Sequence, residues 1–347
     1  MNFYTSIFNK KIKFKKSVFY IFIIFFIVMN SVAFINYLVN PMWAFDSPKF
    51  SSLKQLDFDE RQQKTNYLYF INNRYDNVIL GSSRTTYLNQ NRFDNLLGDT
   101  YNYACNAMSP YEFENFLEHF TKMTHHKPKN IILGLDFFGM NKKTNKLFSS
   151  KKYYKEIFSK FYRLKILYNL KVLQFSIKNI KELYKNKKAY YDSNQIKHIP
   201  FKRGVELENH IKATLKHFVP FKYDNDIVKY YEQLKYEYNK SNFIIFTPPI
   251  TYQQLILNHN DNLDEYYFKW LRSLVKIFGK VYHFMYPSDF TKNINNFYNA
   301  NHFHDISGDK ISKDIVDGIN GEVKFGIILN KDNIEDFISS YKKSFKD

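Results

Sequence analysis

The feature that most constrains this chain is a long apolar run near its N-terminus. Residues 17–39 read SVFYIFIIFFIVMNSVAFINYLV and contain no charged side chain. As a helix that rises 1.5 Å per residue, the run is long enough to cross about 30 Å of hydrocarbon. A helix that is apolar on every side does not suit the surface of a soluble domain, where one face must meet water. The sequence therefore predicts one membrane span, over residues 17–39.

Basic residues before this run predict its orientation. The segment immediately upstream carries Lys10, Lys11, Lys13, Lys15 and Lys16. By the positive-inside rule, residues 1–16 form a cytoplasmic tail and the rest of the chain lies outside the cytoplasm. We expect a single-pass protein of the cytoplasmic membrane with an extracytoplasmic domain. The alternative is a cleaved signal peptide, because Val18–Met29 has the length of a signal hydrophobic region and Ser31-Val32-Ala33 offers small residues for cleavage.

The composition narrows the classes of function. The 347 residues include 51 Lys and Arg against 33 Asp and Glu, a formal charge of +18. A basic balance alone does not indicate nucleic-acid binding, and the predicted export of the domain argues against a nucleic-acid partner. The single cysteine, Cys105, excludes an intramolecular disulfide and cysteine-based metal clusters, and we interpret it as buried and inert. No cofactor or metal site is predicted.

The exported part has the pattern of an α/β fold. Short apolar runs that read as buried strands occur at 77–81, 101–104, 130–135, 242–246 and 280–284, and a helical spacing of apolar residues covers 111–124. Continuous apolar strands alternating with helices indicate a parallel sheet covered on both faces, a three-layer, flavodoxin-like sandwich. We place this domain at 71–347, after a polar connector at 40–70. Ligands of such sheets bind at the carboxyl ends of the strands.

A basic segment interrupts the alternation. Residues 142–203 contain 18 Lys and Arg but only 3 acidic residues, and apolar residues recur there at roughly helical spacing. We expect a helical insertion on one side of the sheet. It is either a solvated helical face of a lysine-rich chain or a surface that meets anionic lipid or an anionic envelope polymer.

Polar residues follow three of the predicted elements. Gly81-Ser82-Ser83-Arg84 follows the first strand, Gly134-Leu135-Asp136 ends the third, and Asn299-Ala300-Asn301-His302 lies late in the chain. Each has an ordinary explanation: a turn or helix cap, a loop cap and a surface histidine. Together, these three segments supply a hydroxyl group that can act as a nucleophile and an imidazole that can act as a base.

This combination resembles the SGNH/GDSL hydrolase superfamily. In that family a Gly-Asp-Ser block supplies the nucleophile and an Asp-x-x-His block supplies the base and its orienting acid. The resemblance implies that Ser83 is the nucleophile and His302 the base, with Asn299 in the position of the usual Asp. Because Asn299 cannot supply charge, Asp305 is the alternative partner of His302, and a Ser–His dyad is the third possibility.

The two middle blocks of the family are matched more loosely. The glycine that donates a backbone N–H falls within Ala104-Cys105-Asn106-Ala107-Met108, where we assign Asn106 or Ala107, and the Gly-x-Asn block becomes Gly134-Leu135-Asp136. Asn106, Asp136 and Arg84 are the expected oxyanion or substrate residues. An ionised Asp136 would oppose an oxyanion, so it must be protonated or point away.

The sequence pattern is similar to that of a membrane-anchored branch of exported SGNH-like proteins. The shared features are an N-terminal anchor, the Gly-Ser-Ser-Arg block and a Gly six residues after the late His. Relatives with this layout include the D-alanyl-lipoteichoic acid transfer protein and alginate O-acetyltransferase families, which act on cell-envelope polymers. The resemblance implies an envelope-anchored serine esterase or O-acyltransferase acting on an envelope polysaccharide or other acylated glycan. The alternative is an inactive SGNH-like module that binds such a polymer or an integral-membrane acyltransferase.

Overall fold

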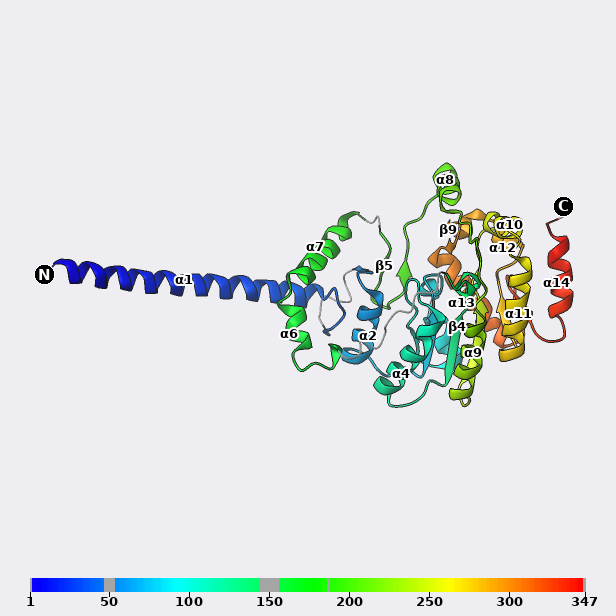
Figure 1. Cartoon of the computed structure of the whole chain (residues 1–347), viewed down its shortest axis with the longest axis horizontal. Coiled ribbons are helices and arrows are strands. Elements are labelled where there is room, and N and C mark those ends of the chain that lie inside the picture. Colours follow the sequence, from blue (N-terminus) through cyan, green and yellow to red (C-terminus); the bar gives the residue numbers. More distant parts are fainter. Residues whose placement is uncertain (1, 47–53, 144–155, 186–187, 346–347) are drawn as a thin grey trace.

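A computed structural model describes residues 2–46, 54–143, 156–185 and 188–345 (Figure 1). Helix α1 (Asn2–Val39) projects as a rod from a body that contains the other elements, and the C-terminal helix α14 (Ile334–Lys343) lies at the opposite end of that body. Within α1, Lys15–Val39 is long and apolar enough to cross a membrane. The apolar side chains of residues 19–28 are exposed, as expected of a helix that lacks protein neighbours.

The body is built on a six-stranded sheet. Five strands are parallel and run in the order β3-β2-β4-β7-β8, and β11 pairs antiparallel with β8 at the edge. The strand bounds are β2 (Asn77–Gly81), β3 (Thr100–Asn102), β4 (Asn130–Gly134), β7 (Asn242–Thr247), β8 (Val281–His283) and β11 (Ile327–Leu329). The five predicted strands are thus confirmed, with β3 and β8 shorter than expected, and β11 was not predicted.

Helices pack against both faces of this sheet. Alternate residues of β2 point to opposite sides, so Val78 and Leu80 join one apolar cluster while Ile79 joins another. The first cluster is covered by α4 (Phe113–Thr124), α9 (Asn225–Glu237), α11 (Asp264–Phe278) and α14, and the second by α3 (Asn91–Leu97), α12 (Asp289–Lys292) and α13 (Asp305–Ile319). The protein is a mixed α/β chain with a mostly parallel central sheet and one N-terminal apolar helix.

Residues 40–70 do not form a simple polar connector. Trp43 and Ala44 are fully buried, and α2 (Glu60–Phe70) buries a run of polar side chains, Gln62, Gln63, Lys64, Thr65 and Asn66. Two of these groups are bonded to backbone carbonyls: Gln63 donates to Pro41 and Leu56, and Lys64 donates to Asn102 and Ala104. The described residues of this segment, 40–46 and 54–70, are therefore part of the folded body.

The basic insertion is only partly helical. It holds α6 (Tyr162–Leu167) and α7 (Leu170–Lys185), but also β5 (Tyr190–Tyr191) and β6 (Lys197–His198), which form a small antiparallel sheet with β1 (Gln55–Leu56). Residues 144–155 of the predicted insertion lie outside the described residues. Figure 1 shows α6 and α7 at the edge of the body from which α1 emerges.

Short elements complete the chain. The remaining helices and strands are α8 (Gly204–Thr214), α10 (Tyr252–Asn260), β9 (Phe297–Asn299), β10 (His302–Phe303) and the 3-10 helices η2 (Thr85–Tyr87), η3 (Pro110–Glu112), η4 (Phe137–Met140) and η5 (Ile294–Asn296). The predicted helix at 111–124 is confirmed as η3 running into α4.

Candidate active site

Ser83 lies on a tight turn directly after β2. The carbonyl oxygen of Ser82 accepts hydrogen bonds from the N–H groups of Thr85 (2.9 Å) and Thr86 (3.3 Å), and the Thr86 hydroxyl donates to the Ser83 carbonyl (2.6 Å). These bonds leave the half-buried Ser83 side chain at the apex of the turn. The turn continues into the three-residue 3-10 helix η2.

His302 meets Ser83 although the two are 219 positions apart in sequence. The distance from Ser83 Oγ to His302 Nε2 is 2.8 Å, which is a hydrogen bond. His302 begins β10, which forms a two-stranded hairpin with β9, and α13 follows. The predicted nucleophile and base are therefore brought together.

Gly308 permits this approach. It lies in the first turn of α13, and a Cβ atom there would collide with the backbone carbonyl of Tyr87 in η2. Any side chain at this position would push the start of α13 away from the Ser83 turn. The glycine six residues after His302 thus has a packing reason: it lets the two halves of the site close.

Asn299 orients the imidazole. Its Oδ1 lies 3.0 Å from His302 Nδ1 and accepts two backbone N–H groups, those of Asn301 and His302, each at 2.9 Å. Two backbone donors identify the atom as the oxygen of the amide, since an NH₂ group there would face them with its own hydrogens. Nδ1 must then carry the proton, which leaves the lone pair of Nε2 directed at the Ser83 hydroxyl. This is the tautomer that a general base requires.

The surroundings of His302 disfavour its charged form. Burial, followed by the positive charges of Arg84, Lys197 and Lys216, lowers the pKa of His302 to about 3. The imidazole is therefore neutral at physiological pH and able to accept a proton. An imidazolium at this position receives a hydrogen-bond acceptor from Asn299 but no opposite charge, because an amide is neutral.

Asp305 does not orient His302. Both ring nitrogens of His302 are occupied by Ser83 and Asn299, and the Asp305 carboxylate instead lies 2.8 Å from His198 Nδ1. The other nitrogen of His198 is 3.0 Å from Asp192. Hydrogen bonds to Asp192 and then Asp305 raise the pKa of His198 to about 9. Of the two candidates considered, the structure thus selects Asn299, because Asp305 begins α13 and its side chain is held by the insertion.

Asp136 follows β4 at the same sheet edge as Ser83, as predicted, since Gly81 and Gly134 are register partners in β2 and β4. Its carboxylate accepts a hydrogen bond from Arg84 Nη1 at 2.5 Å, in an ion pair that is largely buried. Arg84 also donates from Nε to the Asn301 carbonyl and from Nη2 to Asn301 Oδ1. The pair joins the Ser83 turn, β4 and the His302 loop, and a guanidinium neutralises the carboxylate.

Asn106 does not offer its backbone N–H to the site. That group donates to Glu60 Oε2, and the Asn106 side chain donates to Asp57. The next residue, Ala107, adopts a left-handed conformation with φ 50°, where glycine is favoured. Arg61 donates hydrogen bonds to the carbonyls of both residues and thereby holds the loop in place. Asn106 therefore does not take the expected oxyanion role in this structure, because Glu60 and Asp57 engage its backbone N–H and its side chain.

A buried ionic cluster behind this loop was not predicted. Lys197 is 2% exposed and donates from Nζ to Glu60 Oε1 (2.6 Å) and Asp57 Oδ2 (2.9 Å). Tyr191 also donates to Glu60 (2.6 Å). The members come from the supposed connector and from the basic insertion, so the cluster joins these two segments next to the loop that holds Asn106. Composition gave no signal for this, because each charge alone looks like a surface charge.

Cys105 is fully buried, and burial raises the pKa of its thiol well above the usual range. A thiol that stays protonated is a poor nucleophile. Ser83, rather than Cys105, is the nucleophile that the geometry offers.

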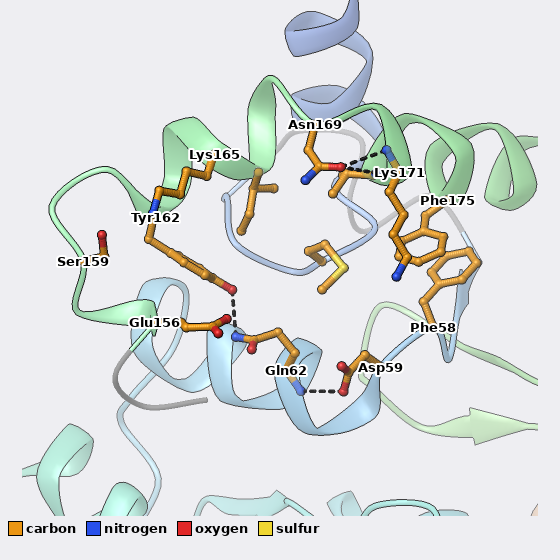
Figure 2. Close-up of a pocket in the computed structure, with 13 residues that line it drawn as sticks. Phe58, Asp59, Gln62, Glu156, Ser159, Tyr162, Lys165, Asn169, Lys171 and Phe175 are labelled. Atoms are coloured by element: carbon orange, nitrogen blue, oxygen red, sulfur yellow. Dashed lines mark hydrogen bonds between the residues drawn. The ribbon is translucent and has the colours of Figure 1, made fainter. Parts of the chain in front are cut away.

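A large cavity lies away from Ser83. It has a volume of about 1030 Å³ and is lined by residues of α2, α6 and α7 near the end of α1, among them Gln62, Tyr162, Asn169 and Phe175 (Figure 2). Beside the pair formed by Ser83 and His302, Arg84 and Asn301 line a space of only about 10 Å³ with Phe138 and Phe218. We take the hydrogen-bonded pair, and not the cavity near α1, as the candidate active site.

Comparisons of this chain with protein-family models, with curated proteins and with solved structures find no match.

Proposed function

We propose that the protein is an SGNH-type serine esterase or O-acyltransferase, anchored by α1 in the cytoplasmic membrane and acting on an acylated glycan outside it. The observation that carries the proposal is the relay from Ser83 through His302 to Asn299 at the carboxyl edge of a parallel sheet. The strand order and the helices on both faces support the three-layer fold of that superfamily.

In the proposed reaction, His302 Nε2 takes the proton of the Ser83 hydroxyl while Oγ attacks the carbonyl carbon of an ester. The resulting tetrahedral oxyanion collapses, the proton passes from His302 to the leaving alkoxide, and the acyl group remains on Ser83. A water or a sugar hydroxyl then attacks this ester, gives its proton to His302 and regenerates Ser83. Water makes the protein an esterase and a sugar hydroxyl makes it a transferase.

The positive charges around His302 serve the oxyanion. The electrostatic effect of Arg84, Lys197 and Lys216 that opposes an imidazolium also favours a developing negative charge nearby. Arg84 has five N–H donors, of which the described contacts use three. In place of the amide donor of the Gly-x-Asn block, this chain presents a guanidinium held by Asp136.

The direct test is labelling with a fluorophosphonate, which phosphonylates an activated serine. Wild-type protein should be labelled and Ser83→Ala should not. Ser273→Ala, which removes an exposed hydroxyl on α11, is the matched control and should label like the wild type. Labelling of Ser83→Ala at the wild-type level would contradict the assignment of the nucleophile.

The second candidate is a catalytically silent module that binds an envelope polymer or an integral-membrane acyltransferase. The observation that favours it is the uncharged Asn299 behind a histidine whose pKa is low. A folded protein whose Ser83 resists the fluorophosphonate from pH 5 to pH 9 would favour this second function.

A further inference from the structure

Helices α6 and α7 form a hairpin that clasps the end of α1. Asn36 of α1 is fully buried and donates to the carbonyls of Leu167 (2.8 Å) and Asn169 (3.1 Å), while the Ser176 hydroxyl donates to Asn36 Oδ1 (3.0 Å). The carbonyl of Leu167 belongs to the last residue of α6, which lacks a partner within its own helix. The amide in this apolar helix thus serves to fasten α1 to the hairpin.

The outer face of the hairpin is apolar. On α7, the exposed residues Leu170 (61% exposed), Ile177 (40%) and Ile180 (39%) form a stripe at helical spacing with the half-buried Leu173. The inward side of α7 carries Val172, Ser176, Asn179 and Glu182, so its buried face is the more polar one. Such an inversion is unfavourable in water and suits a helix whose outer face meets a medium other than water.

The second helix of the hairpin continues this face. Leu164 of α6 is 50% exposed, and Phe161 and Tyr168, which flank α6, are also exposed. Basic side chains rim the apolar ones, and those on the exposed surface of the hairpin include Lys160, Arg163, Lys165, Lys171, Lys178 and Lys181. We call this surface, composed of the exposed apolar residues of 161–180 and the basic residues around them, the collar.

The length of α1 determines how deep in the membrane the collar lies. From Ser17, after the last lysine of the tail, about 30 Å of helix at 1.5 Å per residue ends near Asn36. The carbonyls that bind Asn36 therefore lie at the outer boundary of the hydrocarbon. The Tyr168 hydroxyl donates to Asn30 (3.3 Å), which is six residues, or about 9 Å of helix, deeper along α1.

We propose that the collar is embedded in the outer interface of the membrane and binds anionic phospholipid. Its apolar stripe enters the boundary between headgroups and acyl chains, and its lysines and Arg163 contact the lipid phosphates. The collar is continuous with the surface of α1, which is why lipid is its occupant. The inference rests on the proposed membrane placement of α1 and is independent of the chemistry at Ser83.

The test uses full-length protein in proteoliposomes, with an NBD fluorophore on single introduced cysteines. The native Cys105 is buried and does not react in the folded protein. Leu164→Cys and Leu170→Cys report on the collar. Val205→Cys on α8 and Tyr236→Cys on α9 are exposed controls in the body, at 69% and 78%. Phe22→Cys, 67% exposed on α1, reports on the span itself.

We expect lipids with nitroxide headgroups or shallow nitroxide acyl chains to quench NBD at Leu164 and Leu170 at least about twofold, and to leave both body controls unquenched. Quenching at Phe22 by deep nitroxides, without quenching at the collar positions, would overturn the inference while α1 remains a span. Absence of quenching at Phe22 would mean that the placement of α1 itself fails. A blue shift at the collar without quenching would mean that protein, such as a second copy, covers it, and would also overturn the inference.

The charge of the lipid is tested in the same system. Raising anionic lipid from zero to about 30 mol% should increase collar quenching, and Lys178→Gln with Lys181→Gln should reduce that increase. Equal quenching in zwitterionic and anionic vesicles would overturn the assignment of anionic lipid.

Discussion

The sheet edge at Ser83 and the collar at the end of α1 distribute polarity in opposite ways. At the sheet edge, polar groups such as Arg84, Asp136 and Asn299 converge on a partly exposed hydroxyl. At the collar, amides such as Asn36 and Asn179 point inward and apolar side chains point outward. The contrast shows that burial alone does not identify a functional surface. The first arrangement suits the chemistry that we propose for Ser83, and the second suits the contact with lipid that we propose for the collar.

Loss of His302 should have the largest effect on the sheet edge. His302→Ala removes the proton acceptor of Ser83, so the rate of fluorophosphonate labelling should fall at least about 10³-fold. His217→Ala, at an exposed histidine, is the control. The collar readouts, which are NBD quenching at Leu164 and Leu170, should be unaffected. A variant that loses both labelling and collar quenching would show that the two regions are not separable.

A carboxylate at position 299 should make the site more active. In Asn299→Asp, the new Oδ1 can accept the same three hydrogen bonds, and its charge raises the pKa of His302 from about 3 toward neutrality. We expect labelling at pH 8 to increase by about 10²-fold, the lower end of what a well-matched general base contributes. Asn301→Asp, at the residue that precedes His302 and binds Arg84 in place of the ring, tests whether any added charge suffices.

The same change should alter the pH profile. A base acts when it is neutral, so wild-type labelling should stay level as the pH falls from 8 to 5, since His302 is protonated only near pH 3. Asn299→Asp should lose activity on acidification at a higher pH than the wild type. Coincident acid limbs in the two proteins would contradict the assigned role of Asn299.

At the collar, Asn36→Leu should loosen the hairpin without touching Ser83. Leucine has a similar volume but leaves the carbonyls of Leu167 and Asn169 and the Ser176 hydroxyl without their partner, a local cost of about 1–3 kcal/mol. Amide hydrogen exchange should become faster in α6 and α7 and stay unchanged in β2 and β4. Asn30→Leu, which removes the exposed contact to Tyr168 and a bond to the Phe26 carbonyl within α1, should have a much smaller effect on α6 and α7.

The smallest expected effect concerns His198, which ties the insertion to α13. Its pKa is raised in the folded protein, to about 9, so the stabilisation is fully present below the unfolded value of about 6.5 and is lost as the pH rises through 9. Because the side chain is 31% exposed, the contribution is at most about 1 kcal/mol. The difference in thermal midpoint between wild type and His198→Gln should therefore shrink between pH 6 and pH 10. A constant difference would contradict this role.

The sequence predicted those parts of the protein whose causes are local. Continuous apolar runs identified β2, β4 and β7, and the order of strands placed Ser83 and Asp136 at one edge. Strand β11 (Ile327–Leu329), which pairs antiparallel with β8 at the edge of the sheet, was not predicted. The choice between Asn299 and Asp305 could not be made from spacing, since Asp305 is withdrawn by His198, a residue about 100 positions earlier.

The prediction of a polar connector at residues 40–70 was wrong for a related reason. Polar side chains such as Gln63 and Lys64 normally indicate exposure, yet here backbone carbonyls distant in sequence satisfy them in the interior. For α7 the sequence pattern gives the opposite error. Apolar residues at helical spacing normally predict a buried face, but the stripe on α7 is exposed. Hydrophobic pattern alone does not say which solvent a face will meet.

The clasp on Asn36 has a consequence for the reach of the protein. A domain on a slack tether sweeps a wide volume and meets partners at an effective concentration set by tether length. Here Asn36 near the end of α1 is hydrogen-bonded to the α6–α7 hairpin, and Trp43 and Ala44, just beyond α1, are buried in the body. With α1 in a bilayer, the hydroxyl of Ser83 would stay at one height above the lipid and sample a thin layer parallel to it. Partners would have to enter that layer, which favours molecules that are themselves carried by the membrane.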